Sequence, residues 1–546
     1  MMRSMLFSAA IAVLLSANGA EAVRSVLYPA DWKPGFADAE GNWLPDFSYA
    51  GYHQGRKTLP ASHKIFADVT RPPYLADPTG IREAAAAVQK ALDEAGRAGG
   101  GVVYLPPGTY RLKFPEGADA ALRIRHSKVI LRGAGPEKTR LFLDETESRG
   151  KNMILVRPDA DIWWFSEQPQ FTTVTADLLR PTRDIPVAST EGFRAGDTVL
   201  LRNTVTEEFI AEHGMTGKWH PGDRQLRGVL LPRRITAVDA AKKVIRLDAP
   251  TFYEMKVRDR TRLSKIADRS LQEVGVEELS LGMRENPEIP DWTARDPVDT
   301  AFTKPENGAY HIHASAALRF MYCENGFIRH VNSYRPEGNR KIHIHSNGIR
   351  LDYSRQITVT GCDWHNPQYR GGGGNGYLYT LNCNDSVIRD SSATNGRHNF
   401  DFQNMHTAGN VVYNCTIRNG AIPSDFHMYL STGNLIDSVT CDGDYWECRF
   451  RPYGGKVMHG QGGAGNVFWN LRGERYPANR KFIVDSQQAR RGMVIGTGGS
   501  AFKASWKSSG LRELIGRGDR LEPQSLWLDQ VNRRDQREAA EDRKKQ

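Results

Sequence analysis

Five short segments in the middle of the chain repeat one pattern of alternating apolar and polar residues. They begin at Ile349, Tyr377, Phe400, Phe426 and Phe450, so successive segments start 23–28 residues apart. A repeat of this length is typical of solenoids, in which one unit is too small to bury its own apolar face. Alternation with a period of two residues is typical of a half-buried strand. The repeat therefore predicts parallel strands stacked turn upon turn, as in a β-helix.

Stacking the five segments in register predicts two columns of side chains. The inner column is apolar and comprises Ile349, Leu351, Tyr377, Tyr379, Phe400, Phe402, Phe426, Met428 and Phe450. The outer column is polar and comprises Arg350, Asp352, Thr380, Asp401, Gln403, His427, Tyr429, Arg451 and Tyr453. Neighbouring strands lie about 4.8 Å apart, so acid, imidazole, phenol and guanidinium groups of this column meet within a few strands. We expect the outer column to be the functional face.

Composition and charge exclude some classes of protein. The 546 residues are 39% hydrophobic and 25% charged, which is typical of a soluble protein. The net charge of +10 is a weak guide to the partner, because part of the excess lies in the tail Arg533–Lys545. No basic patch interleaved with aromatic residues is present, so we expect no nucleic acid as partner. We expect no membrane span, because no segment after the N-terminus reaches 18 apolar residues. We also expect a monomer.

The N-terminus, residues 1–22, has the pattern of an export signal. Arg3 supplies the positive start, Met5–Leu15 the apolar stretch, and Ala20-Glu21-Ala22 a cleavage site. We therefore expect export to the periplasm or the medium, with a mature protein that starts near Val23.

The rest of the chain divides by pattern into five parts. We predict an ordered extension, a helix with the first β-helix turns, an inserted β-rich module, the main β-helix carrying the site, and a charged tail that is a frayed helix or disordered. Their bounds are 23–63, 64–170, 171–255, 256–505 and 506–546.

The second of these parts begins with a helix signal. Asp77-Pro78-Thr79-Gly80 is a typical helix start. The apolar face of the predicted helix consists of Ile81, Ala85, Val88 and Leu92, and the glycines from Gly96 to Gly101 end the helix. Two short strands around a Pro-Gly turn follow over Gly101–Leu112, and another follows over Lys128–Gly135.

This opening resembles a known family. A helix followed by Gly-Gly-Gly-Val-Val-Tyr-Leu-Pro-Pro-Gly-Thr-Tyr (99–110) and Val-Ile-Leu-Arg-Gly-Ala-Gly (129–135) is similar to the start of the pectate-lyase-like superfamily. The resemblance implies an all-β fold, a right-handed parallel β-helix whose open end the helix caps. It leaves the activity open, because the superfamily includes lyases, hydrolases, epimerases and fructan-converting enzymes.

Charged and titratable residues gather at the same place in three consecutive repeats. They are Arg397, His398 and Asp401, then Asp425, His427 and Tyr429, then Arg449, Arg451, Tyr453 and His459. Asp401 and His427 lie one repeat apart, so we expect their side chains at neighbouring outward positions. A carboxylate beside an imidazole raises the pKa of the imidazole and fixes its tautomer, as general acid–base catalysis requires. The cluster predicts the active site of a carbohydrate-active enzyme.

Three functions remain open. The first is a polysaccharide lyase that acts on a uronate-containing chain. In it His427 is the base, Arg449 or Arg451 the partner of the substrate carboxylate, and Tyr429 or Tyr453 the acid. His398 and Arg397 could take either of the first two roles. The second is a glycoside hydrolase or transglycosylase that uses Asp401 and Asp425 as paired carboxylates. The third is a carbohydrate-binding solenoid without catalysis.

Other residues complete the predicted site. We expect substrate contacts from Arg397, Arg350, His343, His345, Tyr453, His459 and Trp364. His311-Ile312-His313 and His343-Ile344-His345 alternate as on a strand, which is the pattern of a metal half-site, but neither motif contains a carboxylate. We therefore prefer a polar ladder or sugar contacts for them and assign no metal ligand. Calcium is the one cofactor that the sequence leaves open.

Overall fold

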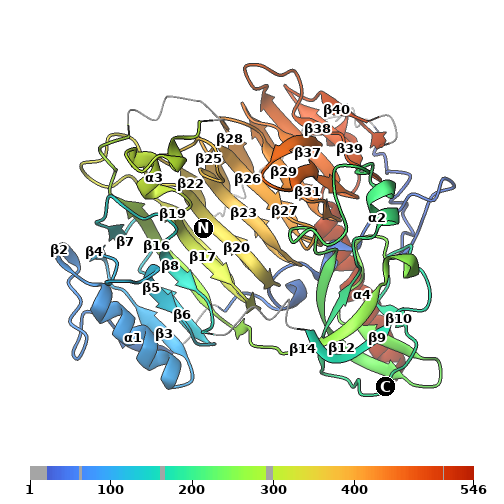
Figure 1. Ribbon diagram of the computed structural model, residues 1–546, viewed down its shortest axis with the longest axis horizontal. Helices are drawn as coiled ribbons and strands as arrows, with labels where there is room; N and C mark the ends of the chain where they lie inside the picture. The colour runs from blue at the N-terminus through green and yellow to red at the C-terminus, as the bar shows by residue number, and fades with distance from the viewer. Residues whose placement is uncertain (1–20, 61–63, 160–166, 290–298, 508–509, 546) are drawn as a thin grey trace, which may run out of the picture.

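Strands from successive turns of the chain pair in parallel and build two long sheets, so the protein is a parallel β-helix (Figure 1). The computed structural model describes residues 21–60, 64–159, 167–289, 299–507 and 510–545. Apolar side chains of both sheets meet in one continuous core between them. The predicted fold class is confirmed. No helix among the described residues has both the length and the apolar character that a membrane crossing needs.

One of the two is a 12-stranded sheet, which carries the predicted site. Its main path consists of β5 (Ala120–Ile124), β8 (Asn152–Val156), β17 (Ala316–Met321), β20 (Asn347–Arg355), β23 (Tyr377–Asn384), β26 (His398–Gln403), β29 (Ser424–Met428), β33 (Trp446–Cys448), β38 (Val484–Ser486) and β40 (Ala504–Trp506), with the short β15 (Leu271–Gln272) and β18 (Cys323–Glu324) beside it.

The other is a 19-stranded sheet that forms the remaining walls of the solenoid. It comprises β1 (Ile65–Asp68), β2 (Thr79–Glu83), β3 (Gly101–Tyr104), β4 (Gly108–Leu112), β6 (Val129–Arg132), β7 (Thr139–Leu143), β16 (Gly275–Met283), β19 (Phe327–Ser333), β21 (Thr358–Thr360), β22 (Asp363–His365), β24 (Val387–Arg389), β25 (Ser392–Thr394), β27 (Val411–Tyr413), β28 (Thr416–Arg418), β31 (Leu435–Asp437), β32 (Thr440–Asp442), β37 (Val467–Arg475), β39 (Met493–Gly499) and β41 (Leu511–Glu513).

The register between repeats differs from the predicted one by two residues. Tyr379, not Tyr377, lies beside Phe400, and Phe402 lies beside Phe426. The rings of each of these pairs stack with centroids 4.5 Å apart. A slip of two residues by itself leaves every side chain on its predicted face, because the side-chain period of a strand is two. Six members of the predicted inner column do lie in the solenoid core, namely Ile349, Leu351, Tyr379, Phe400, Phe402 and Phe426. Tyr377, Met428 and Phe450 lie outside it, and most of the predicted neighbours are wrong.

The fifth predicted repeat is not a turn of the solenoid. The next turn of the sheet after β29 is β33, and Glu447 of β33 lies beside Asp425 of β29. The segment that starts at Phe450 is β34 (Phe450–Gly454), which pairs antiparallel with β35 (Met458–Gln461). A further short parallel pair joins β30 (Ser431–Thr432) and β36 (Gly463–Ala464). The hairpin β34–β35 explains why Arg451, Tyr453 and His459 face the solenoid from outside its wall.

The N-terminal helix starts later than predicted. It is α1 (Ala85–Arg97), at one end of the solenoid (Figure 1), and it buries Ala85, Val88 and Leu92 as expected. The preceding residues form β2, which pairs with β4, so Ile81 is exposed rather than on the buried helix face. Asp77 does not cap the helix; its carboxylate accepts hydrogen bonds from the backbone amides of Thr79 and Arg82.

The inserted module is a separate antiparallel sheet with its own apolar core. Its strands are β9 (Glu167–Thr173), β10 (Asp184–Pro186), β11 (Thr198–Arg202), β12 (Leu230–Asp239), β13 (Val244–Leu247) and β14 (Arg262–Ile266), with the short helix α2 (Glu207–Glu212). It packs beside the solenoid (Figure 1). Buried Trp219 donates its indole N–H to the carbonyl of Met458 in β35, so the module holds the hairpin in place.

The C-terminal tail, predicted to be a frayed helix or disordered, is the helix α4 (Leu526–Lys545), and its first half is packed. Gln530 bonds to the backbone of Pro45 and Phe47, and the buried guanidinium of Arg534 donates to the carbonyl of Ser48. The sequence suggested solvation because the helix is highly charged. Contacts with the N-terminal extension bury two of its polar residues, which no local pattern could reveal.

Candidate active site

Two carboxylates on neighbouring turns form the centre of the site. Asp401 of β26 lies directly beside Asp425 of β29, and both side chains are fully buried. The predicted neighbour of Asp401, His427, is two positions further along. The outer column of the 12-stranded sheet therefore runs Arg350, Thr380, Asp401, Asp425, Glu447.

A bulge in β29 sets the position of His427. The ladder between β26 and β29 shifts between Phe402–Phe426 and Gln403–Met428, which leaves His427 as an extra residue. Bulges re-aim side chains and are frequent beside active sites. Here Nδ1 of His427 lies 3.1 Å from Oδ2 of Asp425.

Asp425 is the hub of a buried network. Its Oδ2 atom also lies 3.3 Å from Nδ1 of His398 and pairs with the guanidinium of Arg451. Arg451 in turn lies 3.0 Å from a carboxylate oxygen of Glu447 and donates to the hydroxyl of Tyr453 at 2.9 Å. The structure thus brings together His398, Asp425, His427 and Arg451, as the sequence predicted.

The opposite side of His427 is lined by rings. Nε2 of His427 lies 3.4 Å from the hydroxyl of Tyr377, which accepts a hydrogen bond from Arg397 at 2.9 Å. The His459 ring lies 5.1 Å from the His427 ring and 5.7 Å from the Tyr453 ring. Sequence reasoning missed Tyr377 and Glu447. The signal for Tyr377 was its place opposite His398, which only the corrected register reveals.

Burial dominates the electrostatics of the site. It raises the pKa of Asp401 to about 7, with a contribution from the charge of Asp425. It also raises the pKa of Asp425, a rise that the guanidinium groups of Arg451 and Arg397 oppose. Burial and the same two guanidinium groups hold the pKa of His427 well below its usual range. His427 is therefore a neutral imidazole at neutral pH, oriented by a carboxylate.

The raised pKa of Asp401 predicts that its effect on the stability of the fold changes with pH. An unfolded aspartate titrates near pH 3.9, whereas folded Asp401 titrates at about 7. The folded state binds this proton more tightly than the unfolded state does. The resulting contribution of Asp401 to the free energy of unfolding is fully present below about pH 4 and is lost as the pH rises through 7. We expect Asp401→Asn to be more stable relative to wild type at pH 8 than at pH 5. Urea denaturation at both pH values measures this, with Asp184→Asn, a half-exposed carboxylate, as control; equal differences at both pH values would contradict it.

Several predicted contacts lie elsewhere. Arg350 pairs with Asp352, two turns from Asp401. The Tyr429 hydroxyl is buried and donates to the carbonyl of Val457. His345 is fully buried, with Ser148 and the carbonyl of Arg284 as partners, so its predicted substrate contact is wrong. His311 and His313 lie in and after the short helix α3 (Gly308–Ile312), not on a strand, so they form no shared face.

Trp364 is a core residue, which contradicts its predicted contact with the substrate. Its side chain is fully buried and donates its indole N–H to the carbonyl of Val331. We expect Trp364→Ala to lower the free energy of unfolding by about 3–5 kcal/mol, because it leaves a large cavity. Chemical denaturation checks this, and Phe171→Ala, at an exposed aromatic residue, is the control. An unchanged stability together with weaker sugar binding would restore the first interpretation.

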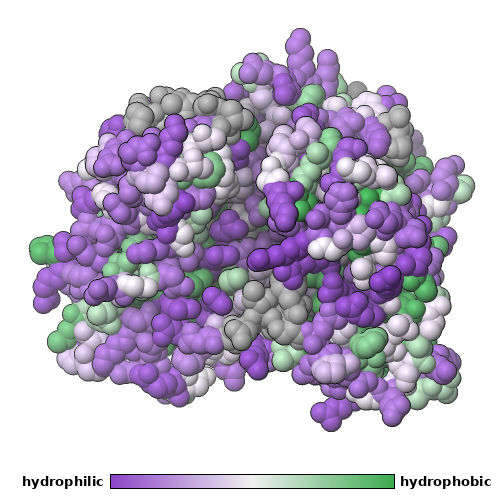
Figure 2. Space-filling view, in the orientation of Figure 1, coloured by the Kyte–Doolittle hydropathy of each residue, from purple (hydrophilic) through white to green (hydrophobic). Residues whose placement is uncertain are grey.

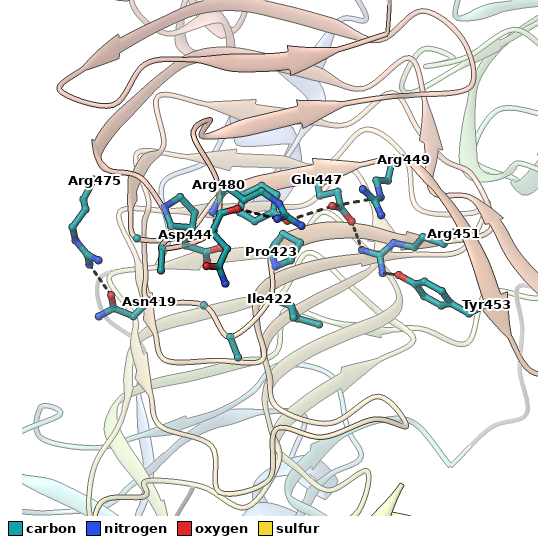
Figure 3. Close-up of a pocket in the computed structure, with 17 residues that line it drawn as sticks. Asn419, Ile422, Pro423, Asp444, Glu447, Arg449, Arg451, Tyr453, Arg475 and Arg480 are labelled. Carbon is teal, nitrogen blue, oxygen red and sulfur yellow. Dashed lines mark hydrogen bonds and ion pairs between the residues drawn. The ribbon is translucent and has the colours of Figure 1, made fainter. Parts of the chain in front are cut away.

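A cavity of about 500 Å³ adjoins the buried network. Figure 3 shows Glu447 between Arg449 and Arg451, with Tyr453 beyond Arg451 and Arg475 joined to Asn419 on the other side. Arg480 completes a set of four arginines in the lining, against the acids Asp444 and Glu447. The molecular face seen in Figure 2 is predominantly hydrophilic, with scattered hydrophobic residues. These features suit a polar, anionic ligand.

The cluster of His398, Asp425 and His427 has the donor set of a metal site. One ligand atom from each of the three lies within 4.8 Å of the others. Two imidazoles and a carboxylate suit zinc or another transition metal, whereas calcium prefers oxygen ligands only, so the cluster does not fit the calcium ion that the sequence left open. The guanidinium of Arg451 already occupies Oδ2 of Asp425 and competes with any cation there.

One family model matches the N-terminal part of the solenoid. Residues 73–182 match the family model described as rhamnogalacturonase A/epimerase, pectate lyase-like. The chain carries a pectate lyase-like domain. This match covers α1 and the first solenoid strands, which confirms the resemblance seen in the sequence. The protein is thus a parallel β-helix whose first turns match a pectate lyase-like family model.

More distant likenesses involve short stretches or low similarity. A stretch of 61 residues is 46% identical to the mannuronan C5-epimerase AlgE6 of Azotobacter vinelandii, over 11% of this chain and 7% of that protein. The tailspike gp61 of Pseudomonas phage phi297 aligns with a TM-score of 0.37 at 11% identity, over 80% of this chain and 76% of that one. The AlgE6 A-module of Azotobacter vinelandii aligns with a TM-score of 0.28 at 12% identity, over 79% and 74%.

Proposed function

We propose that this protein is a polysaccharide lyase that cleaves a uronate-containing chain by β-elimination. The observation that carries the proposal is a neutral His427, held by buried Asp425, whose partner Arg451 lines a cavity together with three further arginines. Elimination requires a base for the proton next to the substrate carboxylate, a cation for that carboxylate and an acid for the leaving oxygen. The cluster and its cavity contain a candidate for each role.

The contacts favour particular residues for these roles. Asp425 accepts a hydrogen bond from Nδ1–H of His427, which leaves Nε2 as the base. Arg449 is 44% exposed and suits the substrate carboxylate better than Arg451, which is buried with Asp425 and Glu447 as partners. Tyr453 is 51% exposed and bonded to Arg451, so it suits the acid role better than buried Tyr429. His398, behind Asp425, positions the network.

The proposed elimination transfers one proton to His427 and one proton from Tyr453. Nε2 of His427 takes the proton from the carbon that bears the carboxylate, and the electron pair left there forms a double bond to the neighbouring ring carbon. The bond from that carbon to the glycosidic oxygen breaks, and the leaving oxygen takes the proton of the Tyr453 hydroxyl. Arg449 stabilises the negative charge that develops on the carboxylate during this step.

Epimerisation is the second candidate, and the partial match to a mannuronan C5-epimerase favours it. Its first step is the same proton abstraction, after which a proton returns to the opposite face of the ring and no bond to the leaving oxygen breaks. Tyr377 lies 3.4 Å from His427, and Tyr453 belongs to the same network through Arg451, so these two are the candidates to return that proton.

A hydrolase that uses Asp401 and Asp425 is less well supported. Adjacent strands would place the two carboxylates near the separation of about 5–5.5 Å that retaining glycosidases use. Both side chains, however, are fully buried, and Asp425 is already paired with Arg451. A sugar cannot reach them without displacing the residues that cover them.

One experiment separates these functions. The purified protein is incubated in D₂O with a panel of acidic and neutral polysaccharides, and three signals are followed. A lyase produces unsaturated uronate absorbance and new reducing ends. An epimerase incorporates deuterium at C5 without either. New reducing ends without absorbance indicate a hydrolase, and the absence of all three signals across the panel would reject enzymatic action in favour of binding alone.

We also propose that the protein is exported. The N-terminal pattern supports this, although Arg3 and Met5–Leu15 lie outside the described residues. N-terminal sequencing of the protein from the periplasm and the medium tests it, and an intact Met1 in both fractions would reject cleavage near Val23.

A further inference from the structure

A second histidine cluster lies in a separate cavity of about 330 Å³ over the outer face of the 19-stranded sheet. His343 and His365 line it together with Asp363 and Ser333, and it shares no lining residue with the arginine-lined cavity. The sequence paired His343 with His345. The fold instead pairs it with His365, because the chain before β20 runs beside β22 in parallel.

The two imidazoles are spaced as ligands of one metal ion. Their ring centroids lie 5.4 Å apart, with an angle of 39° between the planes. Two imidazoles that bind one tetrahedral ion at about 2.0–2.1 Å place their centroids roughly 5 Å apart. The observed spacing is therefore close to that of a bound pair.

Hydrogen bonds orient both rings through one nitrogen and leave the other for a ligand. Nε2 of His365 lies 2.7 Å from Oδ2 of Asp363, and Nδ1 of His343 lies 2.9 Å from Oγ of Ser333. With a proton on each of these nitrogens, Nδ1 of His365 and Nε2 of His343 carry the free lone pairs. Metal-binding histidines are usually fixed in this way, by a carboxylate or another oxygen at the far nitrogen.

The backbone holds the two histidines together before any ion binds. The amide of His343 donates to the carbonyl of Asn366, and the amide of His365 donates to Oγ of Ser333. Asp363 is held in turn by the hydroxyl of Ser392. A site whose ligands are fixed in this way needs little rearrangement on binding.

The charges around this cavity tolerate a cation better than those around the buried cluster. Glu137 and Asp363 balance Arg140 and Arg335 in the lining. Arg335 donates to the carbonyl of Asn339, and Arg140 lies over the ring of Tyr334. No guanidinium in the described structure pairs with Asp363, whereas Arg451 occupies Asp425 in the other cluster.

We propose that His343 and His365 bind a divalent transition-metal ion such as Zn²⁺ or Cu²⁺, with Asp363 and Ser333 as positioning residues and water in the remaining positions. Imidazole nitrogens select this class of ion over calcium or magnesium. The ion would pin the segment before β20 to β22. The proposal does not depend on the proposed lyase activity.

The test is titration of the metal-free protein with Cu²⁺, followed by electron paramagnetic resonance and equilibrium dialysis. We expect one saturable site whose spectrum shows two coupled nitrogens. His343→Ala and His365→Ala should each weaken binding by at least about tenfold, and Asp363→Asn by about 10–100-fold. His330→Ala, an exposed histidine bonded to Glu278, should bind as wild type does.

Thermal denaturation with and without Zn²⁺ gives a second readout. Zn²⁺ should raise the melting temperature of wild type and His330→Ala but not of the His343→Ala/His365→Ala double variant, because a ligand of the folded state alone stabilises it. Circular dichroism without metal confirms that the variants fold. Equal binding by wild type and the double variant would overturn the proposal. Loss of binding in His427→Ala rather than in His365→Ala would also overturn it.

Discussion

His427→Ala is expected to lower kcat/KM of the proposed lyase on its acidic polysaccharide by about 10²–10⁴-fold, which is the usual contribution of a general base. The variant removes the imidazole whose Nδ1 lies 3.1 Å from Asp425 and leaves that buried carboxylate with Arg451 and His398. Initial rates of unsaturated-uronate formation measure the effect. His427→Gln, which keeps much of the side-chain volume, should be similarly impaired.

His330→Ala is the matched control, because it removes an exposed imidazole from the 19-stranded sheet and should leave the rate unchanged. A nearly normal rate in His427→Ala would contradict the assigned base. If Asp401→Asn instead abolished new reducing ends, the paired-carboxylate mechanism would replace it.

The pH dependence follows from the same contacts. Burial and the guanidinium groups of Arg451 and Arg397 hold the pKa of His427 well below its usual range. The base must be neutral, and His427 takes up its proton only as the pH falls through this lowered pKa and not near 6.5, where an exposed histidine does. Burial raises the pKa of Asp425, the carboxylate that orients this base, to about 7. We therefore expect the acid limb of the kcat/KM profile to lie near pH 7 and to report protonation of Asp425 rather than of His427.

Arg233→Met is expected to lower the free energy of unfolding by about 3–5 kcal/mol, because it leaves a buried carboxylate without its partner. Arg233 of β12 and Asp385 of the solenoid lie 2.9 Å apart, and neither side chain has any exposed surface. Arg355 remains 3.8 Å from Asp385, but it also pairs with Asp248, so we expect a loss near the lower limit.

Urea denaturation followed by tryptophan fluorescence measures this loss. Arg246→Met breaks a half-exposed pair with Asp184 in the same module, and we expect it to cost no more than about 1 kcal/mol. Adding Asp385→Leu to Arg233→Met should recover part of the stability, because it removes the buried carboxylate that had lost its partner. Equal losses in Arg233→Met and Arg246→Met would show that the buried pair does not anchor the module.

The hairpin β34–β35 differs from the parallel repeat that the sequence predicted. Arg451, Tyr453 and His459 were correctly grouped with the site, but as a further solenoid turn rather than as a hairpin of antiparallel strands. Phe450-Arg451-Pro452-Tyr453 alternates as the true repeats do, so local pattern could not separate the two. What decides is the pairing of β29 with β33, and that pairing depends on residues far apart in the chain.

The sequence by itself determined the β-helix, the capping helix and the outward face of Arg350, Thr380 and Asp401, because alternation within a strand is a local property. Only the tertiary structure decided that Asp425, not His427, lies beside Asp401, since register depends on the lengths of the turns between strands. It also decided that Trp364 is core and that His343 meets His365. Burial of the carboxylates, which raises the pKa of Asp401 to about 7, arises because surrounding segments cover the column, and no repeat unit encodes that covering.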